Sequence, residues 1–123
     1  MPVTKKLRKS VADKVVADTM VGGATLTKLL STSAWYAPGA SCAAMVKSIL
    51  LDEKKVFPCC CYLEGEYGQK DLCIGVPAII GKRGCEKVLE YDLTKEEKAA
   101  FDKSAAAVKN VNNVLYESKI LSR

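Results

Sequence analysis

Apolar residues recur at helical intervals along the first thirty positions, with charged residues between them. The repeating positions are Leu7, Val11, Val15, Val16 and Met20. This spacing predicts an amphipathic helix with one apolar stripe. Gly22-Gly23 interrupts the stripe, at roughly 1 kcal/mol per glycine relative to alanine in a helix interior, and the pattern resumes at Leu26. We therefore expect a helix that is kinked or broken at the two glycines.

A second helix is predicted to follow and to end near Leu50. Hydroxyl side chains at positions 31–33 favour a helix boundary, and Pro38 is acceptable in a first helical turn, where an N–H would have no intrahelical partner. The apolar face of this helix consists of Met45, Val46, Ile49 and Leu50. Small residues, Gly39-Ala40 and Ala43-Ala44, offer a smooth surface that indicates an interface.

The pattern changes to that of β-strands from Val56 onward. Segments 56–63 and 72–80, the second broken by Pro77, are separated by a turn at 64–68. A turn at 81–84 precedes a third strand from Cys85 to Leu93, whose apolar residues at 89, 91 and 93 alternate with acidic ones. Three sequential strands with short connections predict an antiparallel meander.

The last predicted element is a helix that begins at Lys95. Thr94 and Glu97 have the spacing of a capping box, in which each side chain satisfies the other's free backbone N–H. The expected buried stripe consists of Phe101, Ala105, Val108, Val111 or Asn112, and Leu115, while Lys98, Lys103 and Lys109 face solvent. The element order predicts an α+β fold, a three-stranded antiparallel meander packed with helices over one face.

Composition and charge narrow the function classes. The chain has 123 residues, 49% hydrophobic and 27% charged, as one ordinary globular domain does. Its net charge of +5 is dispersed among acidic residues without interleaved aromatics, so we expect no nucleic-acid partner. Charges within residues 10–18 break the apolar run of an export signal, and no stretch reaches the ~20 apolar residues of a membrane span.

Few residues of the sequence are candidates for catalysis, redox chemistry or metal binding. Six cysteines include consecutive Cys59, Cys60 and Cys61, whose side chains alternate between sheet faces, and C-x-x-C spacing and histidine are both absent. We interpret all six, Cys42 and Cys85 included, as small buried hydrophobes in a reducing cytoplasm; a cysteine-based redox or metal protein is the weakest hypothesis. The Glu64 and Glu66 carboxylates are expected to be solvated rather than metal ligands, and Trp35 and Tyr36 to anchor packing.

Four sequence blocks resemble a known enzyme family. They are VGGATLTKLL, TSAWYAPGAS, YLEGEYG and KDLCIGVPAIIGKRGCEKV, in that order between Val21 and Val88. Together they resemble the C-terminal, substrate-side part of bacterial-type NAD-dependent malate dehydrogenases in the lactate/malate dehydrogenase family, with likeness from about Pro2 to about Leu121. The resemblance implies that residues 1–123 form a partial C-terminal domain of a cytoplasmic, oligomeric oxidoreductase acting on a small dicarboxylic acid, malate.

The resemblance also implies which parts of the enzyme lie elsewhere. In the family, NAD is held by an N-terminal Rossmann domain, and a His-Asp pair and substrate arginines precede the region represented here. This chain has no histidine and no G-x-G-x-x-G, so no catalytic or metal residue is assigned, and Arg8, Arg83 and Arg123 carry no substrate role. We expect an excised fragment, a truncated reading frame or the product of an internal start, and we expect the chain to be inactive alone.

The wall of the substrate pocket is the part of the site that the resemblance places on this chain. It assigns Ser33, Ala34 and Pro38 to that wall, whereas residue pattern alone explains Ser33 and Pro38 as a helix start. The expected partners are the missing Rossmann domain and identical subunits in a homo-oligomer. An alternative hypothesis is a non-catalytic interaction module that associates through Gly39-Ala40 and the Ala43-Ala44 face.

Overall fold

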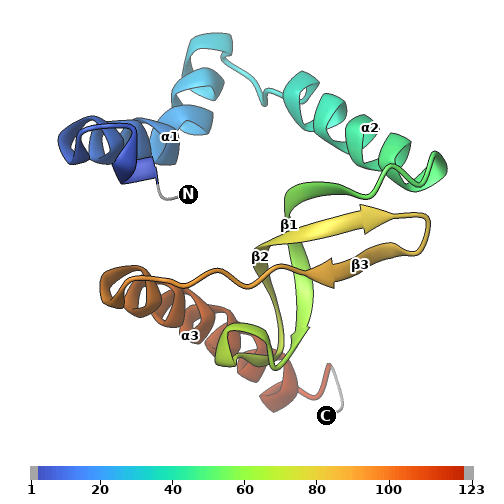
Figure 1. The fold of residues 1–123 in the computed structure, drawn as a ribbon. Coiled ribbons are helices and arrows are strands. Elements are labelled where there is room, and N and C mark those ends of the chain that lie inside the picture. Colours follow the sequence, from blue (N-terminus) through green and yellow to red (C-terminus); the bar gives the residue numbers. More distant parts are fainter. Residues whose placement is uncertain (1–2, 121–123) are drawn as a thin grey trace. The chain divides into compact units, whose positions relative to one another are not determined.

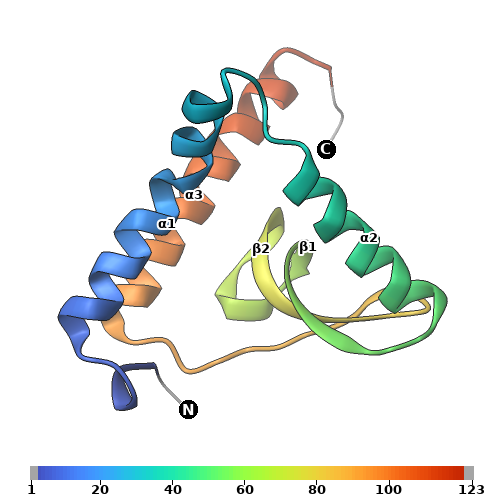
Figure 2. The same ribbon diagram turned by 90° about the horizontal axis from the view of Figure 1, so that it is seen from above.

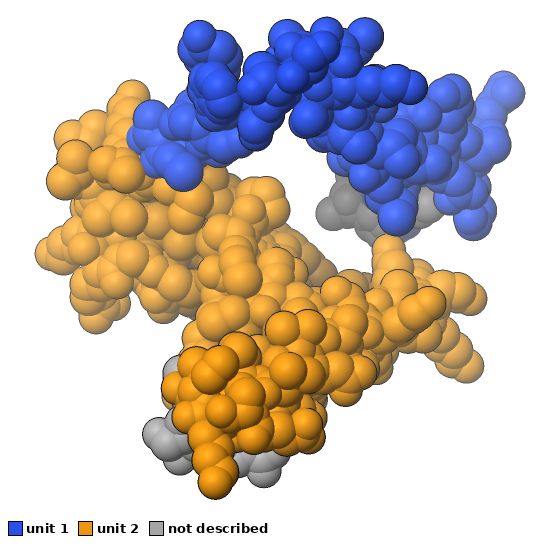
Figure 3. Space-filling model, turned by 180° about the vertical axis from the view of Figure 1, so that it is seen from behind, with its two compact units in different colours: residues 1–43 blue, residues 44–123 orange. Residues whose placement is uncertain are grey.

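The computed structural model describes residues 3–120, and the chain divides into two compact units between Ala43 and Ala44 (Figure 3). The first unit contains the 3-10 helix η1 (Val3–Lys5), helix α1 (Lys9–Leu30) and the first half of helix α2 (Tyr36–Leu50). The second contains the rest of α2, then β1 (Lys55–Glu64), the 3-10 helix η2 (Glu66–Gly68), β2 (Lys70–Gly81), β3 (Gly84–Val88) and helix α3 (Lys95–Glu117). The predicted element order is confirmed.

The three strands form an antiparallel sheet in the order β1-β2-β3, as the sequence predicts (Figure 1). β1 and β2 are long and curve together (Figure 2). Alternate side chains of both strands face the core, because neighbouring strand residues point to opposite faces. The buried apolar residues are Cys61, Leu63, Leu72, Ile74, Val76, Ala78, Ile80 and, from α3, Ala105. Burial of each larger side chain contributes about 1.5–3 kcal/mol.

Two prolines face each other across the β1–β2 pair. Pro77, which was predicted to break its strand, lies within β2 opposite Pro58 of β1, and the strand continues through it. Proline has no N–H to donate to the ladder. The Pro77 carbonyl accepts from the Leu89 N–H at 2.8 Å, on the side away from β1, so the two prolines form a non-hydrogen-bonded pair and do not interrupt the β1–β2 ladder.

The end of α2 is attached to the sheet by a buried hydrogen bond. Ser48 has an exposed fraction of 0%, and its hydroxyl donates to the carbonyl oxygen of Ile80 at 2.7 Å. A buried hydroxyl without a partner costs about 1–3 kcal/mol, so this bond both satisfies Ser48 and fixes the helix at the end of β2. Ile49 packs against the same core.

Helix α3 begins at Lys95 as predicted, and both hydrogen bonds of the Thr94–Glu97 capping box are present. Its apolar stripe packs on the sheet, with Phe101 against the ring of Tyr67 at 5.2 Å between centroids. The open choice in that stripe is resolved in favour of Asn112, which is half-buried, because Val111 is exposed. The C-terminal half of the inward face of α3 therefore combines the partly buried apolar residues Val108 and Leu115 with the polar Asn112.

The predicted interruption of the first helix is wrong. α1 continues through Gly22-Gly23, because a glycine in a helix interior costs only about 1 kcal/mol. A side chain at either glycine would meet nothing within 4 Å. α1 has no buried residue, and Trp35 and Tyr36, which were predicted to anchor packing, are exposed as well. The exposed apolar residues of α1 are Val11, Val15, Val16, Met20, Val21, Leu26, Leu29 and Leu30.

The third predicted strand is too long, because β3 ends at Val88 and residues 89–94 are not a strand. Side chains from η2 replace the ladder there. The Tyr67 hydroxyl donates to the Leu89 carbonyl at 2.6 Å and accepts from the Tyr91 N–H at 3.1 Å. The carboxylate of Glu90 accepts from the Tyr67 N–H at 2.6 Å. Tyr67 thereby holds the segment that leads into α3.

Replacement of Ile80 by valine should lower the free energy of unfolding by about 1 kcal/mol, the usual cost of deleting one buried methylene. Ile80 is 3% exposed. The matched control is Ile120→Val, the same chemical change at a side chain that is 70% exposed. Urea unfolding followed by circular dichroism measures both, and equal losses in the two variants would contradict the assignment of the core.

Candidate functional site

The three residues predicted to form a pocket wall lie around the connection between α1 and α2. Ser33 and Ala34 belong to the loop, and Pro38 lies in the first turn of α2. Ala34 is half-buried, whereas Ser33 and Pro38 are exposed. The helix start is fixed by the Gly39 N–H, which donates to the Trp35 carbonyl at 2.9 Å. The loop and first turn thus present these three side chains close together along the chain.

Charged residues that were weighed as candidate ligands are engaged locally. The Glu66 carboxylate accepts from the Glu64 N–H at 2.8 Å, and hydrogen bonds from the backbone N–H groups of Glu66 and Glu64 lower the pKa of Glu66. Arg83 lies 3.7 Å from the Glu86 carboxylate, and Arg123 lies outside the described residues. Within residues 3–120 no group of three histidine, cysteine or acidic side chains has the arrangement of a metal site.

The prediction that all cysteines are buried is wrong for most of them. Only Cys61 is buried, Cys59 is partly buried, and Cys42, Cys60, Cys73 and Cys85 are exposed free thiols. Strand parity explains the difference on the sheet, since Cys60 and Cys73 lie on its outer face. The sulfurs of Cys59 and Cys61 are 3.5 Å apart. Burial, followed by hydrogen bonds with Cys85 and Cys59, raises the pKa of Cys61 well above its ordinary value.

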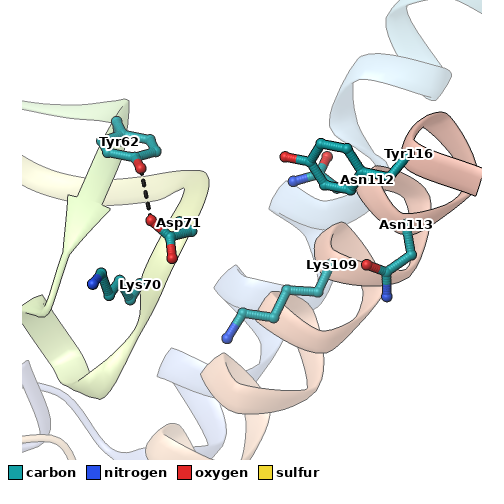
Figure 4. Close-up of a pocket in the computed structure, with 7 residues that line it drawn as sticks. All are labelled: Tyr62, Lys70, Asp71, Lys109, Asn112, Asn113 and Tyr116. Atoms are coloured by element: carbon teal, nitrogen blue, oxygen red, sulfur yellow. Dashed lines mark hydrogen bonds between the residues drawn. The ribbon is translucent and has the colours of Figure 1, made fainter. Parts of the chain in front are cut away.

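A polar cavity of about 740 Å³ lies in the second unit between the β1–β2 hairpin and α3 (Figure 4). It is lined by Tyr62, Lys70 and Asp71 from the strands and by Lys109, Asn112, Asn113 and Tyr116 from the helix. The Tyr62 hydroxyl donates to the Asp71 carboxylate at 2.9 Å, and this bond raises the pKa of Tyr62. The hydroxyl therefore stays protonated near neutral pH, where it serves as a donor.

One of the cavity lysines is held by a chain of hydrogen bonds. The Lys109 ammonium donates to the side-chain oxygen of Gln69 at 3.0 Å, and the Gln69 amide nitrogen donates to Asp102 at 2.7 Å. Lys98 donates to the same carboxylate, which lowers the pKa of Asp102. Figure 4 shows Lys109 extending from α3 toward the strands. The network connects α3 to the start of β2 and orients Lys109.

Sequence reasoning missed this cavity. Its helix wall carries polar side chains at 109, 112, 113 and 116, which is the spacing of one helical face. When the buried face of the helix is deduced from its apolar residues, some of these four positions fall in the buried stripe and the others face solvent. A signal was present in this polar repeat, but the strands that face it could not be placed from their sequence.

The comparison with known proteins decides the family. The α/β C-terminal domain of lactate/malate dehydrogenase matches residues 2–117. The chain is 61% identical over 117 residues to the malate dehydrogenase of Parabacteroides distasonis, and 61% identical over 115 residues to that of Flavobacterium frigidimaris. The chain belongs to the lactate/malate dehydrogenase family. These alignments cover 95% and 94% of this chain, but only 37% of each relative.

Solved structures agree with this membership. The malate dehydrogenase of Salinibacter ruber matches 97% of this chain with a TM-score of 0.86 and 40% identity. The enzyme of Picrophilus torridus matches 98% with a TM-score of 0.85 and 38% identity. The chain covers 40% of each of those proteins. The α+β fold is therefore that of the C-terminal region of the lactate/malate dehydrogenase family, as the sequence predicts.

The family uses NAD, but the described residues do not suit a dinucleotide. Such a site needs a parallel strand that leads through a glycine-rich loop into a helix N-terminus. All strand pairs here are antiparallel, and the G-x-G-x-x-G fingerprint is absent from the sequence. The antiparallel strands of residues 3–120 therefore provide no dinucleotide site of that kind. In the described part of the chain, no helix has the length and apolar character needed to cross a membrane.

The thiols should separate into reactive classes in the native protein. An aromatic disulfide reagent near neutral pH should modify the four exposed cysteines quickly and Cys61 only after unfolding, because burial disfavours its thiolate. Cys60→Ser should remove one thiol from the fast class, and Cys61→Ser should leave that class unchanged. Mass spectrometry counts the modified sites, and rapid modification of Cys61 in the folded protein would contradict its placement.

Proposed function

We propose that this chain serves as the C-terminal, substrate-side domain of an NAD-dependent malate dehydrogenase, which catalyses the reversible oxidation of malate to oxaloacetate. The observation that supports this is the 61% identity to malate dehydrogenases over nearly the whole chain. In this proposal residues 1–123 form part of that C-terminal domain. The six cysteines are all free thiols, which suits the cytoplasm, where disulfides are rare.

The contribution of this chain to the reaction is the wall of the substrate pocket. Ser33, Ala34 and Pro38 lie at the helix start that the family resemblance assigns to that wall. Small side chains there leave room for a dicarboxylic acid and a nicotinamide, and they exclude water when the pocket closes. The residues that would move a proton or hydride belong to the part of the enzyme outside this sequence, and NAD supplies the hydride chemistry when bound there.

The exposed surface of the first unit supports an obligate neighbour. α1 is a helix of 22 residues without a buried side chain, although its apolar positions form a stripe. Apolar faces of this kind are normally covered, since large exposed patches mark interaction sites. The proposed occupants are the Rossmann domain of the same enzyme and the equivalent face of a second subunit in a homo-oligomer.

The purified chain should not oxidise NADH in the presence of oxaloacetate. The chain lacks a histidine for proton transfer and a dinucleotide fingerprint.

A chimaera in which this chain replaces the matched C-terminal region of the Parabacteroides distasonis enzyme should be active. Ala34→Phe in the chimaera should lower kcat/KM by at least about tenfold, because a bulky ring in a pocket wall misplaces the substrate.

The matched control for this substitution is Ala107→Phe, at an exposed position of α3, which should leave kcat/KM within about twofold, as surface substitutions usually do. Activity of the purified chain alone, free of contaminating enzyme, would contradict the proposal that the residues that move the proton and the hydride lie outside this sequence. Equal activity of the two chimaera variants would remove Ala34 from the pocket wall while leaving the enzyme assignment intact.

A second candidate function is a non-catalytic interaction module that joins intact dehydrogenase subunits. The exposed stripe of α1 and the small residues Gly39-Ala40 and Ala43-Ala44 favour it, because small side chains permit close helix approach. Mixed with the intact Parabacteroides distasonis enzyme at micromolar concentration, labelled chain should co-migrate on a sizing column.

Met20→Lys should abolish this co-migration, because Met20 is 81% exposed and would carry a charge into the apolar contact. The control Lys28→Gln alters an exposed polar residue of the same helix and should not change the elution. Separate migration of the wild-type chain and the enzyme would remove the support for this function.

A further inference from the structure

The C-terminal half of α3 has its polar and apolar faces in an unusual arrangement. Val111 and Val114 are exposed, with 64% and 61% of their surface accessible, while Lys109, Asn112, Asn113 and Tyr116 line the cavity against the hairpin. A helix that only packed on a sheet would turn its apolar side chains inward. Val108 and Leu115 of the same half are partly buried, so the polar side chains form a separate strip of the helix that faces the cavity.

The opposite wall is shaped by a β-bulge. Leu63 pairs with Leu72 and Glu64 with Lys70, so Asp71 is the extra residue of β2 and has a φ of +59°. A left-handed backbone at a non-glycine residue is strained, and bulges re-aim side chains near functional sites. In a regular strand, consecutive residues point to opposite faces. Here Lys70 and Asp71 both line the same cavity.

The chemistry of the lining favours an anion. The two ammonium groups outnumber the one carboxylate, and the Asp71 carboxylate already accepts from Tyr62. Lys109 is oriented by Gln69, whereas the side-chain ammonium of Lys70 makes no hydrogen bond or ion pair among residues 3–120. The amides of Asn112 and Asn113 add donors on the helix side. The cavity volume of about 740 Å³ admits a small molecule and lies within the ~300–1,000 Å³ of ordinary ligand pockets.

We propose that the cavity between the β1–β2 hairpin and α3 binds a small polyanion bearing carboxylate or phosphate groups, with Lys70 and Lys109 as its cationic contacts. The amides of Asn112 and Asn113 orient the anion through hydrogen bonds, while the Tyr62 hydroxyl donates to Asp71 and holds that carboxylate in place. Asp71 limits its affinity by repulsion and selects ligands with enough charge to overcome it. This site is separate from the proposed pocket wall at Ser33, Ala34 and Pro38, and it depends on no catalytic residue.

The test is a titration of the ¹⁵N-labelled 123-residue chain near neutral pH, with sodium phosphate and with malonate as separate probes. Sodium chloride keeps the ionic strength constant, because screening alone alters exposed charges. Saturable shifts should appear at the amides of Lys70, Asp71, Asn112 and Asn113. The probe with the lower Kd identifies phosphate or carboxylate as the preferred group, and absence of saturation with both probes overturns the proposal.

Removing a positive charge and removing the negative charge of the cavity should change the Kd in opposite directions. Lys70→Gln and Lys109→Gln should each raise the Kd by about two- to fivefold, and Asp71→Asn should lower it by a similar factor, as expected for charges in partly exposed pairs. Lys103→Gln removes a charge from an exposed position of the same helix, outside the cavity, and should leave the Kd unchanged. An equal effect of Lys103→Gln would show diffuse attraction to a basic surface and overturn the site.

Lys109 also bonds Gln69, so its substitution has a structural component. Lys70→Gln provides the independent variant, because Lys70 makes no such bond within the described residues. The dispersion of the amide spectrum verifies the fold of each variant. A well-folded Lys70→Gln protein with undiminished affinity contradicts the proposed contact.

Discussion

The inward face of β2 is the constraint on which the second unit depends. Alternate side chains from Leu72 to Ile80 are buried, and both neighbouring helices are attached to that strand. Ala105 of α3 packs into the same core, and the Ser48 hydroxyl of α2 is bonded to the last carbonyl of the buried run. The alternation of inward and outward side chains along β2 thus decides which residues of the two helices can be buried. The start of β2, at the turn of the hairpin, lies outside this buried run and forms the polar cavity together with α3.

Features with local causes could be predicted from the sequence. The start of α3 depends on Thr94 and Glu97, which are three residues apart and satisfy each other's backbone donors. The three strands follow from their composition and from turns rich in glycine. The α+β class follows from element order alone, so the sequence was sufficient for the architecture and for the family.

Features with distant causes could not be predicted in the same way. β3 ends early because Tyr67, more than twenty residues upstream, supplies the hydrogen bonds that a longer ladder would have made. Exposure of Cys60 and Cys73 depends on which face of the sheet the helices cover. The polar cavity depends on a one-residue bulge at Asp71 that aligns two consecutive side chains. Each is a consequence of register, which short-range patterns do not specify.

The facing prolines of the hairpin have a consequence for how the chain selects its native alignment. When Pro58 lies opposite Pro77, the two form a non-hydrogen-bonded pair, at which the β1–β2 ladder needs no N–H from either residue. Sliding one strand past the other by an odd number of residues would bring one of the prolines to a hydrogen-bonded position and leave a carbonyl of the other strand unpaired. Such a shift would also turn the buried apolar side chains of that strand toward solvent. The prolines therefore oppose the same odd-numbered slips that side-chain alternation opposes, and the two effects together favour the native alignment of the hairpin.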